Sequence, residues 1–468
     1  MNAGEVPVGR GPKEDDGLRA APHVLDDRGP DGGVPRRRVV AWAAWDWGSA
    51  AFNAVITTFV FTVYLTSSGF GDAAETSSKL GIGTALAGVA IALLAPVIGQ
   101  RADRAGRPAL WLGVNTAVVV TLSALMFTVR PDPAFLWWGI TLVAVGNVFF
   151  EFASVNYNAM LSRVSTPATV GRVSGFGWGA GYLGGIVLLL ILFVGFISPE
   201  VGWFGVTHDD GLNIRVAILI AALWFGVFAV PVLIALPDRR DGNHPRARPL
   251  GVVASYRALF GTIKGLAREH PHTLFFLVAS AVFRDGLAGV FTFGGVIAQG
   301  TFGFTPGQVI VFGIAANVVA GLATIAFGIL DDRLGPKTLI LGSLLAMVLA
   351  GLGIFVFHDQ GTRMFWILGL LLCVFVGPAQ SASRSFLARM IPPGREGEIF
   401  GLYATTGRAV SFLAPLMFTA AIAVGTRVTG GPAQYWGILG IVLVLLAGLL
   451  LLLPVRPEER RSEAVGMP

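Results

Sequence analysis

The apolar residues of this chain are gathered into long blocks, which short polar segments rich in Gly, Pro, Arg and Asp separate. About 20 consecutive apolar residues in a helix cross the roughly 30 Å hydrocarbon core of a bilayer. This pattern predicts an all-α polytopic membrane protein. Twelve blocks are long enough to span: residues 39–66, 79–99, 109–129, 134–161, 173–198, 214–236, 271–299, 306–329, 338–357, 364–388, 399–425 and 434–454.

A basic segment with two glycines lies between the second and third blocks. Its sequence from Gly99 is GQRADRAGRP, and a weaker copy, GILDDRLGPK, begins at Gly328. We interpret both as tight turns between helices. Four residues of the first copy recur in the second at one constant spacing: Gly99, Asp103, Arg104 and Gly106 match Gly328, Asp332, Arg333 and Gly335. The repeat indicates that the chain consists of two halves with one design.

A second repeat follows the fourth and tenth blocks. Arg163 and Gly171 are matched by Arg389 and Gly397 at another constant spacing. Two parallel six-helix halves with a binding site at their interface are a recognised transporter architecture. The sequence therefore predicts two pseudo-symmetric six-helix bundles, residues 39–236 and 271–454. The other divisions are a disordered cytoplasmic tail over 1–38, a linker over 237–270 and a second cytoplasmic tail over 455–468.

Composition supports the membrane prediction, and charge gives an orientation. Hydrophobic residues make up 54% of the chain and charged residues 13%, whereas soluble domains carry about 25% charged residues. With a cytoplasmic N-terminus, about 26 of the 34 Lys and Arg fall in cytoplasmic segments, which is the positive-inside pattern. Both termini are therefore predicted to be cytoplasmic. Abundant Arg, Ala and Gly indicate a bacterial chain and hence the cytoplasmic (inner) membrane, and the net charge of +6 follows from topology rather than from a nucleic-acid partner.

The linker contains a periodic stretch. Arg257, Lys264 and Arg268 lie on other faces than its apolar residues. This arrangement is typical of an amphipathic helix on the cytoplasmic leaflet of the lipid bilayer, and a simple connecting helix is the alternative. The apolar residues recur every three to four positions: Leu250, Val253, Tyr256, Leu259, Phe260, Ile263 and Leu266.

Three further stretches of the sequence indicate a more specific family resemblance. They are AWDWGSAAF from Ala44, FRDG from Phe283 and SRSFLARMIP from Ser383. Six-plus-six helices with the basic segment resemble the major facilitator superfamily, and the three stretches resemble the vacuolar amino-acid effluxers linked to autophagy and their bacterial relatives. The resemblance implies a secondary transporter and, from the fungal branch, amino-acid export. Arg284 departs from the family, which often has an uncharged polar residue there.

Ionisable residues inside the predicted spans are the first candidates for transport. A charged group in mid-bilayer costs at least about 2.5 kcal/mol on insertion scales, so it tends to face a partner or a watery cavity. We expect Arg384, with one other arginine, to bind an anionic group such as a carboxylate, and the acidic residues to bind an ammonium or carry a coupling proton. Interhelical ion pairs that hold the halves closed are the alternative. The candidates are Asp46, Glu151, Arg284, Asp285, Arg384 and Arg408.

Uncharged polar residues on the same helices extend this set. Asn53 follows Asp46 by two helical turns, so both share a face. Asn156 and Asn158 follow Glu151, and Gln380 precedes Arg384 by one turn. Hydrogen bonding between helices is the alternative role for these side chains.

The basic segments have a different expected role. Asp103 and Asp332 lie at cytoplasmic helix ends, where a carboxylate can meet the positive N-terminus of another helix. In the superfamily this segment locks one conformation, and the resemblance implies a contact near Gly397 or Arg172. The expected gating residues are Gly99, Asp103, Arg104, Gly106, Arg107, Asp332, Arg333 and Gly335.

Signatures of an enzyme, a cofactor or a metal site are absent from the sequence. The single cysteine, Cys373, excludes an internal disulfide and a cysteine metal cluster, and the histidines lack ligand spacing. We therefore predict a monomeric secondary transporter that moves a small polar solute, such as an amino acid, by alternating access. Export is favoured and proton coupling is expected. The alternatives are a multidrug or lipid exporter of the same fold and a non-transporting receptor or scaffold.

Overall fold

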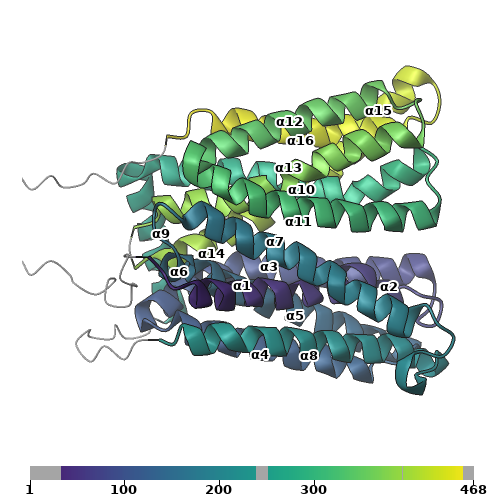
Figure 1. Ribbon diagram of the computed structural model, residues 1–468, viewed down its shortest axis with the longest axis horizontal. Coiled ribbons are helices and arrows are strands. Elements are labelled where there is room, and N and C mark those ends of the chain that lie inside the picture. Colours follow the sequence, from purple (N-terminus) through teal and green to yellow (C-terminus); the bar gives the residue numbers. More distant parts are fainter. Residues whose placement is uncertain (1–32, 239–250, 393, 457–468) are drawn as a thin grey trace, which may run out of the picture.

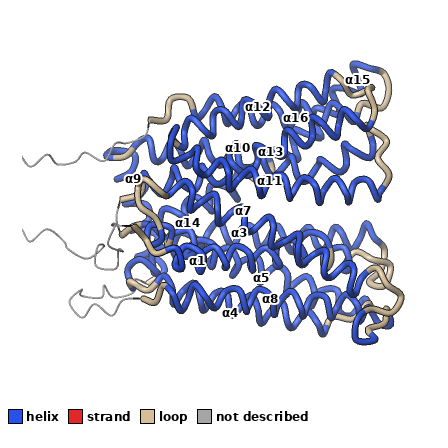
Figure 2. Tube along the Cα trace, in the orientation of Figure 1, coloured by secondary structure: helices blue, strands red, loops and turns tan. Residues whose placement is uncertain are grey.

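The computed structural model describes residues 33–238, 251–392 and 394–456, which are helical apart from loops and one isolated bridge between Val201 and Thr207 (Figure 2). The first half contains α1 Arg36–Ala51, α2 Phe61–Leu65, α3 Ala73–Ala105, α4 Pro108–Leu125, α5 Leu136–Ala159, α6 Leu161–Val164, α7 Val170–Leu192 and α8 Leu212–Ala235. After α9 Val252–Glu269, the second half contains α10 Pro271–Gly300, α11 Pro306–Leu334, α12 Pro336–Val356, α13 Thr362–Met390, α14 Glu396–Val410, α15 Leu413–Thr429 and α16 Gly437–Leu452.

The predicted all-α fold is confirmed. Twelve stretches in the described residues are long and apolar enough to cross a membrane, and each overlaps one of the twelve predicted segments. The first span begins at Arg36 rather than at residue 39. The predicted linker helix is α9. Its apolar face is narrower than expected, because Val253 and Phe260 are exposed on the side of the basic residues. Leu250 and most of the two predicted tails lie outside the described residues.

The basic segments are mostly helical, which corrects the prediction of a tight turn. α3 continues to Ala105 and α11 to Leu334, so only the last residues of each segment form the turn. Gly106 and Gly335 make these turns with φ of 61° and 85°, a region that glycine enters without steric cost. Asp103 therefore lies in the last turn of α3, and its side chain bonds to a helix of the other half.

Two spans are interrupted. A π-helix, Phe52–Phe59, separates α1 from α2 in the first span. The predicted eleventh helix is two helices, α14 and α15, with a break at Ser411 and Phe412. Such departures from α-helical hydrogen bonding recur at functional sites.

The two halves form two bundles that meet at one end. Buried apolar residues gather in one cluster mainly of the first half and one mainly of the second. Across the boundary, α3 packs on α14 and α7 packs on α11. Figure 1 shows the bundles in contact at the end that carries α9, while their ribbons diverge toward the opposite end. We call the former end the α9 end.

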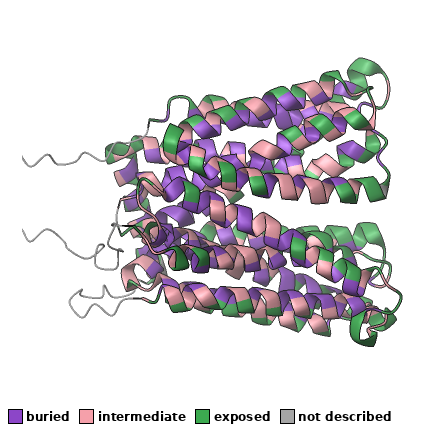
Figure 3. Cartoon of the chain, viewed as in Figure 1, coloured by how far each residue is buried: buried purple, intermediate pink, exposed green. Residues whose placement is uncertain are grey.

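The outer surface of the bundles is apolar. Large side chains such as Leu86, Leu223 and Ile367 are exposed on spanning helices, and Figure 3 shows exposed and half-buried residues along their outward faces. In water this surface would be unfavourable, whereas in a bilayer it contacts lipid. Because lipid gives helices no hydrophobic reason to associate, close packing of small residues takes that role. The glycine-rich helix α7 supplies such residues.

Candidate transport site

Two seams join the bundles at the α9 end. The first is the α3/α14 seam. Asp103 of α3 accepts hydrogen bonds from the backbone amides of Gly397 (2.9 Å) and Glu398 (2.8 Å). These amides belong to the first turn of α14, which has no partners for them within its own helix and carries positive partial charge. The carboxylate thus caps a helix of the other bundle.

The second, the α7/α11 seam, repeats this geometry. Asp332 of α11 accepts from the backbone amides of Gly171 (2.7 Å) and Arg172 (3.1 Å) at the start of α7. Arg389 of α13 bonds to Asp332 (3.1 Å) and also to Asp331 (2.6 Å), whose side chain is 1% exposed. Asp331 also accepts from the Ser385 hydroxyl. This seam therefore contains a buried ion network in addition to the helix cap.

The other predicted gating residues shape these segments. Gly99 lies directly against the carbonyl oxygen of Gly397, so a Cβ atom there would overlap the backbone of α14. Arg333 is exposed, and Arg104 and Arg107 are half-buried. For these three arginines, the described part of the chain shows no side-chain hydrogen bond or ion pair.

One turn deeper than Arg389 on α13, Arg384 forms a buried network between the bundles. Its Nη1 lies 3.3 Å from Asp46 of α1 and 3.3 Å from the side-chain oxygen of Asn158. Its Nε donates to the hydroxyl of Ser174 on α7 (2.9 Å), and its Nη2 donates to the Ser174 carbonyl (2.7 Å). Every nitrogen of the guanidinium is thus paired with the first bundle.

Aromatic rings enclose this arginine. Tyr157 donates to the same Asp46 oxygen at 2.9 Å and stacks on Trp42. The Arg384 guanidinium lies 4.9 Å from the Trp42 ring and 5.5 Å from the Trp178 ring, within cation–π range. Only 4% of the Arg384 side chain is exposed. Arg384 and Asp46 thus form an ion pair between the bundles, which is the geometry that the ion-pair alternative describes.

A polar pocket lies farther from the α9 end. Its volume is about 320 Å³. Arg408, near the end of α14, reaches it from the second bundle and forms an ion pair of 2.9 Å with Glu151 of α5. The Arg408 side chain is 41% exposed and that of Glu151 19%. The lining residues are Asn53, Thr57, Thr62, Thr84, Ala87, Gly88, Ile91, Val143, Asn147 and Arg408.

The remaining candidates have other partners. Asp285 accepts from the amide of Ala414 at 2.6 Å and so caps α15 behind the helix break. Arg284 donates to the Tyr403 carbonyl and lies 3.7 Å from its ring centre. Both contacts stay within the second bundle. They do not join Arg384.

Asn156 and Gln380 also have structural partners. The Asn156 amide donates to the carbonyl of Phe152 one turn earlier, and its side chain is buried. Gln380 accepts from the hydroxyl of Tyr182 at 2.8 Å, which links α13 to α7.

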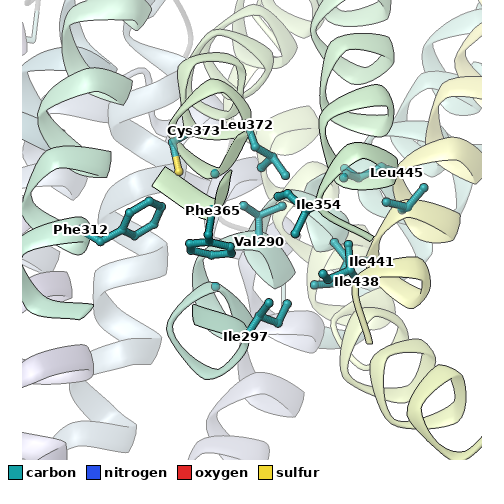
Figure 4. A pocket seen from close by; sticks show the side chains of 14 residues that line it. Val290, Ile297, Phe312, Ile354, Phe365, Leu372, Cys373, Ile438, Ile441 and Leu445 are labelled. Atoms are coloured by element: carbon teal, nitrogen blue, oxygen red, sulfur yellow. The ribbon is translucent and has the colours of Figure 1, made fainter. Parts of the chain in front are cut away.

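A second cavity is apolar and lies inside the second bundle. Its volume is about 50 Å³, and Figure 4 shows Phe312, Phe365, Cys373 and Ile441 among the side chains that surround it. The described residues that line it include no charged side chain. A charged solute would lose its hydration there without gaining partners. This cavity is therefore not the candidate solute site.

The model of the family described as "Vacuole effluxer Atg22 like" matches residues 66–464. The chain belongs to this family. The Atg22-like family consists of transporters of the major facilitator superfamily rather than enzymes, which confirms the resemblance found in the sequence.

Relatives of the chain include bacterial and fungal members. The "Uncharacterized MFS-type transporter YxiO" of Bacillus subtilis (strain 168) is 26% identical over 428 residues, which cover 90% of this chain and 95% of the relative. The "Autophagy-related protein 22" of Yarrowia lipolytica is 26% identical over 353 residues, covering 69% of this chain. That match spans only 57% of the fungal protein's own length.

Solved structures support the fold. The human organic anion transporter MFSD10 (TETRAN) superposes with a TM-score of 0.69 at 16% identity, covering 89% of this chain and 99% of that one. The transporter FucP in its outward conformation gives a TM-score of 0.62 at 12% identity, covering 89% and 97%. At these identities the likeness concerns the fold alone, which is the major facilitator fold.

The sequence did not predict several residues of the ion-pair and hydrogen-bond networks between the bundles. Asp331 precedes the repeated Asp332, but its counterpart in the first half is an alanine, so the repeat gave no signal for it. Ser174 is a small uncharged residue of α7, and no motif of the sequence marks it. Tyr157 carries no charge that would single it out in the sequence, although its hydroxyl bonds to Asp46.

Proposed function

We propose that this Atg22-like chain exports a small zwitterionic solute, with amino acids as the first class to test, by alternating access between its bundles. The observation that carries the proposal is the Glu151–Arg408 ion pair beside the polar pocket. The pair joins α5 of the first bundle to α14 of the second, and both side chains retain exposure. A zwitterion offers one carboxylate for Arg408 and one ammonium for Glu151. It can therefore replace the pair without leaving either charge unpaired.

The surroundings of the pair suit such a solute. Asn53, Thr57 and Asn147 line the pocket with amide and hydroxyl groups, which can orient a small molecule by hydrogen bonds. The pocket volume of about 320 Å³ falls at the low end of ligand sites, which are about 300–1,000 Å³. A large drug would need a wider site.

Alternating access would proceed by opening the α9 end. The two seams and the Arg384–Asp46 pair all lie between that end and the pocket along their helices, so each must separate to admit a solute from there. A proton on Asp46 would cancel the charge that holds Arg384 and so favour separation. This assigns the coupling role to Asp46 and the solute role to Glu151 and Arg408. We propose that the α9 end faces the cytoplasm of a bacterial cell.

Flux in proteoliposomes tests the proposal. We would load a panel of labelled amino acids and measure their movement with and without an imposed proton gradient, for the wild type, Glu151→Gln and Arg408→Gln. Flux of at least one amino acid should fall to background in both variants. The matched controls are Glu75→Gln and Arg427→Gln, which remove the same charges at exposed positions and should leave flux unchanged.

The outcomes separate the parts of the proposal. Unchanged amino-acid flux in Glu151→Gln would remove this residue from the solute site. Movement of other solutes but of no amino acid would overturn the substrate class. Tight binding without movement of any solute would instead support a receptor. Asp46→Asn tests coupling separately, since it should abolish the effect of the proton gradient.

A further inference from the structure

One element at the α9 end takes no part in the proposed solute path. α9 runs over Val252–Glu269 and packs against both α3 and α10. Its inner face carries the buried residues Leu259 and Leu266, which belong to the apolar cluster of the second bundle. The Tyr256 hydroxyl donates to the carbonyl of Leu93 on α3 at 2.8 Å. α9 therefore contacts both halves of the protein.

A direct bond links α9 to the α3/α14 seam. The Thr262 hydroxyl donates to the Glu398 carboxylate at 2.9 Å, and both side chains are buried. The backbone amide of the same Glu398 bonds to Asp103. A change in the position of α9 would therefore move Glu398, whose backbone amide bonds to Asp103 in this seam.

The outer face of α9 has an unusual composition. Val253 and Phe260 are 76% and 70% exposed. Arg257, Lys264 and Arg268 are exposed on the same side of the helix, since these five residues follow one another at spacings of three or four. We call these five residues the outer stripe. It combines two apolar and three basic side chains, and exposure of its Val and Phe to water is unfavourable.

The C-terminal end of α9 lies directly beside a spanning helix. α9 ends at Glu269, and the spanning helix α10 begins at Pro271 with only His270 between them. The C-terminal end of α9 is therefore held at the surface of the bilayer. Apolar side chains that enter the headgroup region beside lysine and arginine are the pattern of an interfacial helix that attracts anionic lipid.

We propose that the outer stripe of α9 is a binding site for the phosphate headgroups of anionic phospholipids, and that lipid bound there supports the closed α3/α14 seam through Thr262 and Glu398. The three basic residues supply the charge for the headgroup. Val253 and Phe260 enter the acyl boundary and fix the depth of the helix. The binding step does not depend on which solute the protein carries, whereas its effect on transport rests on the proposed function.

A quenching experiment on the full chain in liposomes tests the site. Gly261 is an exposed α9 residue, and the space that a Cβ atom would occupy there is open, so Gly261→Cys can carry an environment-sensitive fluorophore. The native Cys373 is buried and is replaced by Ser. We would compare phosphatidylglycerol with phosphatidylcholine, each brominated on its acyl chains and present at equal mole fraction. We expect about threefold stronger quenching by the anionic lipid, with loss of the preference at high salt.

Variants without the basic residues of the outer stripe test whether these residues cause the preference for the anionic lipid. Arg257→Gln, Lys264→Gln and Arg268→Gln together should make the two lipids quench equally. The matched control combines Arg130→Gln, Arg363→Gln and Arg427→Gln, which are exposed away from α9 and should preserve the preference. Equal quenching by both lipids in the unmodified stripe would overturn the proposal. Absence of quenching by either lipid would also overturn it, and would mean that the stripe faces water and suits an acidic protein partner instead.

Discussion

In both seams a carboxylate at the end of one helix bonds to first-turn amides of a helix in the other bundle. Asp103 meets Gly397 and Glu398, and Asp332 meets Gly171 and Arg172. Small residues permit both approaches. Gly401 lies against the Ala95 carbonyl in one seam, as Gly175 lies against the Thr324 carbonyl in the other. The two seams thus share the same backbone arrangement, a carboxylate cap and a close approach at glycine.

The side chains around the two carboxylates differ. Asp332 has Arg389 and Arg172 within ion-pair distance, and the buried Asp331 adds a second carboxylate. In the α3/α14 seam, Glu398 is instead held by the neutral donors Gln100 and Thr262. The difference predicts that the α7/α11 seam is the firmer of the two closures and that the α3/α14 seam is the more adjustable one. The predictions below test this division.

The largest effect is expected at Arg389. Arg389→Gln leaves Asp331 buried, 1% exposed, without its cation, and breaking a buried pair in this way costs about 3–5 kcal/mol. The unfolding free energy in detergent should fall by that amount, and adding Asp331→Asn should restore much of it. The matched control is Arg163→Gln, the repeat counterpart, whose ion pair with Asp238 is more exposed and should contribute about 1 kcal/mol or less. Equal losses in both variants would contradict the interpretation of the α7/α11 seam as the firmer closure.

A second prediction compares glycines at the closest approach. At Gly99 a Cβ would overlap the Gly397 carbonyl, whereas at Gly328 it would lie 3.0 Å from the Gly171 carbonyl. Overpacking of this kind costs about 1–3 kcal/mol, and each 1.4 kcal/mol is about tenfold in population. Gly99→Ala should therefore raise the population open at the α9 end by about tenfold or more, and Gly328→Ala by less.

Spin labels on Arg104→Cys and Arg395→Cys, in a Cys373→Ser background, would report this opening as a longer distance across the α3/α14 seam. The label pair without the glycine substitutions is the reference. A larger effect from Gly328→Ala would mean that the helices approach more closely in the α7/α11 seam than in the α3/α14 seam.

The fold and part of this comparison were predictable from sequence. Spanning helices follow from apolar blocks because the bilayer requires every backbone group to be bonded within its own segment. The repeated motif placed Asp103 and Asp332 at helix ends, and the resemblance to the superfamily implied a contact near Gly397 or Arg172. The motif itself is local, whereas each cap joins two helices of different bundles.

The remaining features depend on three-dimensional contacts. Arg384 became a candidate for solute binding because it lies inside a predicted span. The sequence did not show that Tyr157 and Ser174, from two other helices, contact its guanidinium. The pairing of Glu151 with Arg408 joins residues of both bundles, and no spacing rule relates them. The π-helix and the break between α14 and α15 occur in apolar stretches that read as continuous helix. Tertiary packing, rather than the hydrophobic period, decides these points.

A third prediction concerns the carboxylates themselves. Asp103→Asn keeps one of the two acceptor oxygens and replaces the other by an NH2 donor, so one of the two backbone amides loses its partner and the remaining hydrogen bond loses its charge. The closed seam should lose at least about 1 kcal/mol, which the same spin-label pair would detect as a severalfold or larger shift toward the open α9 end. Asp332→Asn should shift it further, because Arg389 then keeps only Asp331 as its acidic partner. An unchanged distance distribution in both variants would remove these residues from gating.

The smallest effect is expected at Thr262, where α9 meets the adjustable seam. Thr262→Val keeps the shape of the side chain and removes one hydrogen bond to Glu398, a net loss of about 0.5–1.5 kcal/mol. Glu398 still accepts from Gln100, so the seam should loosen without separating, and the open population should rise by about tenfold or less. Thr262→Ser, which keeps the hydroxyl, should behave as the wild type. If valine and serine loosen the seam equally, α9 acts through its apolar packing alone, and the hydrogen bond to Glu398 plays no part in adjusting this seam.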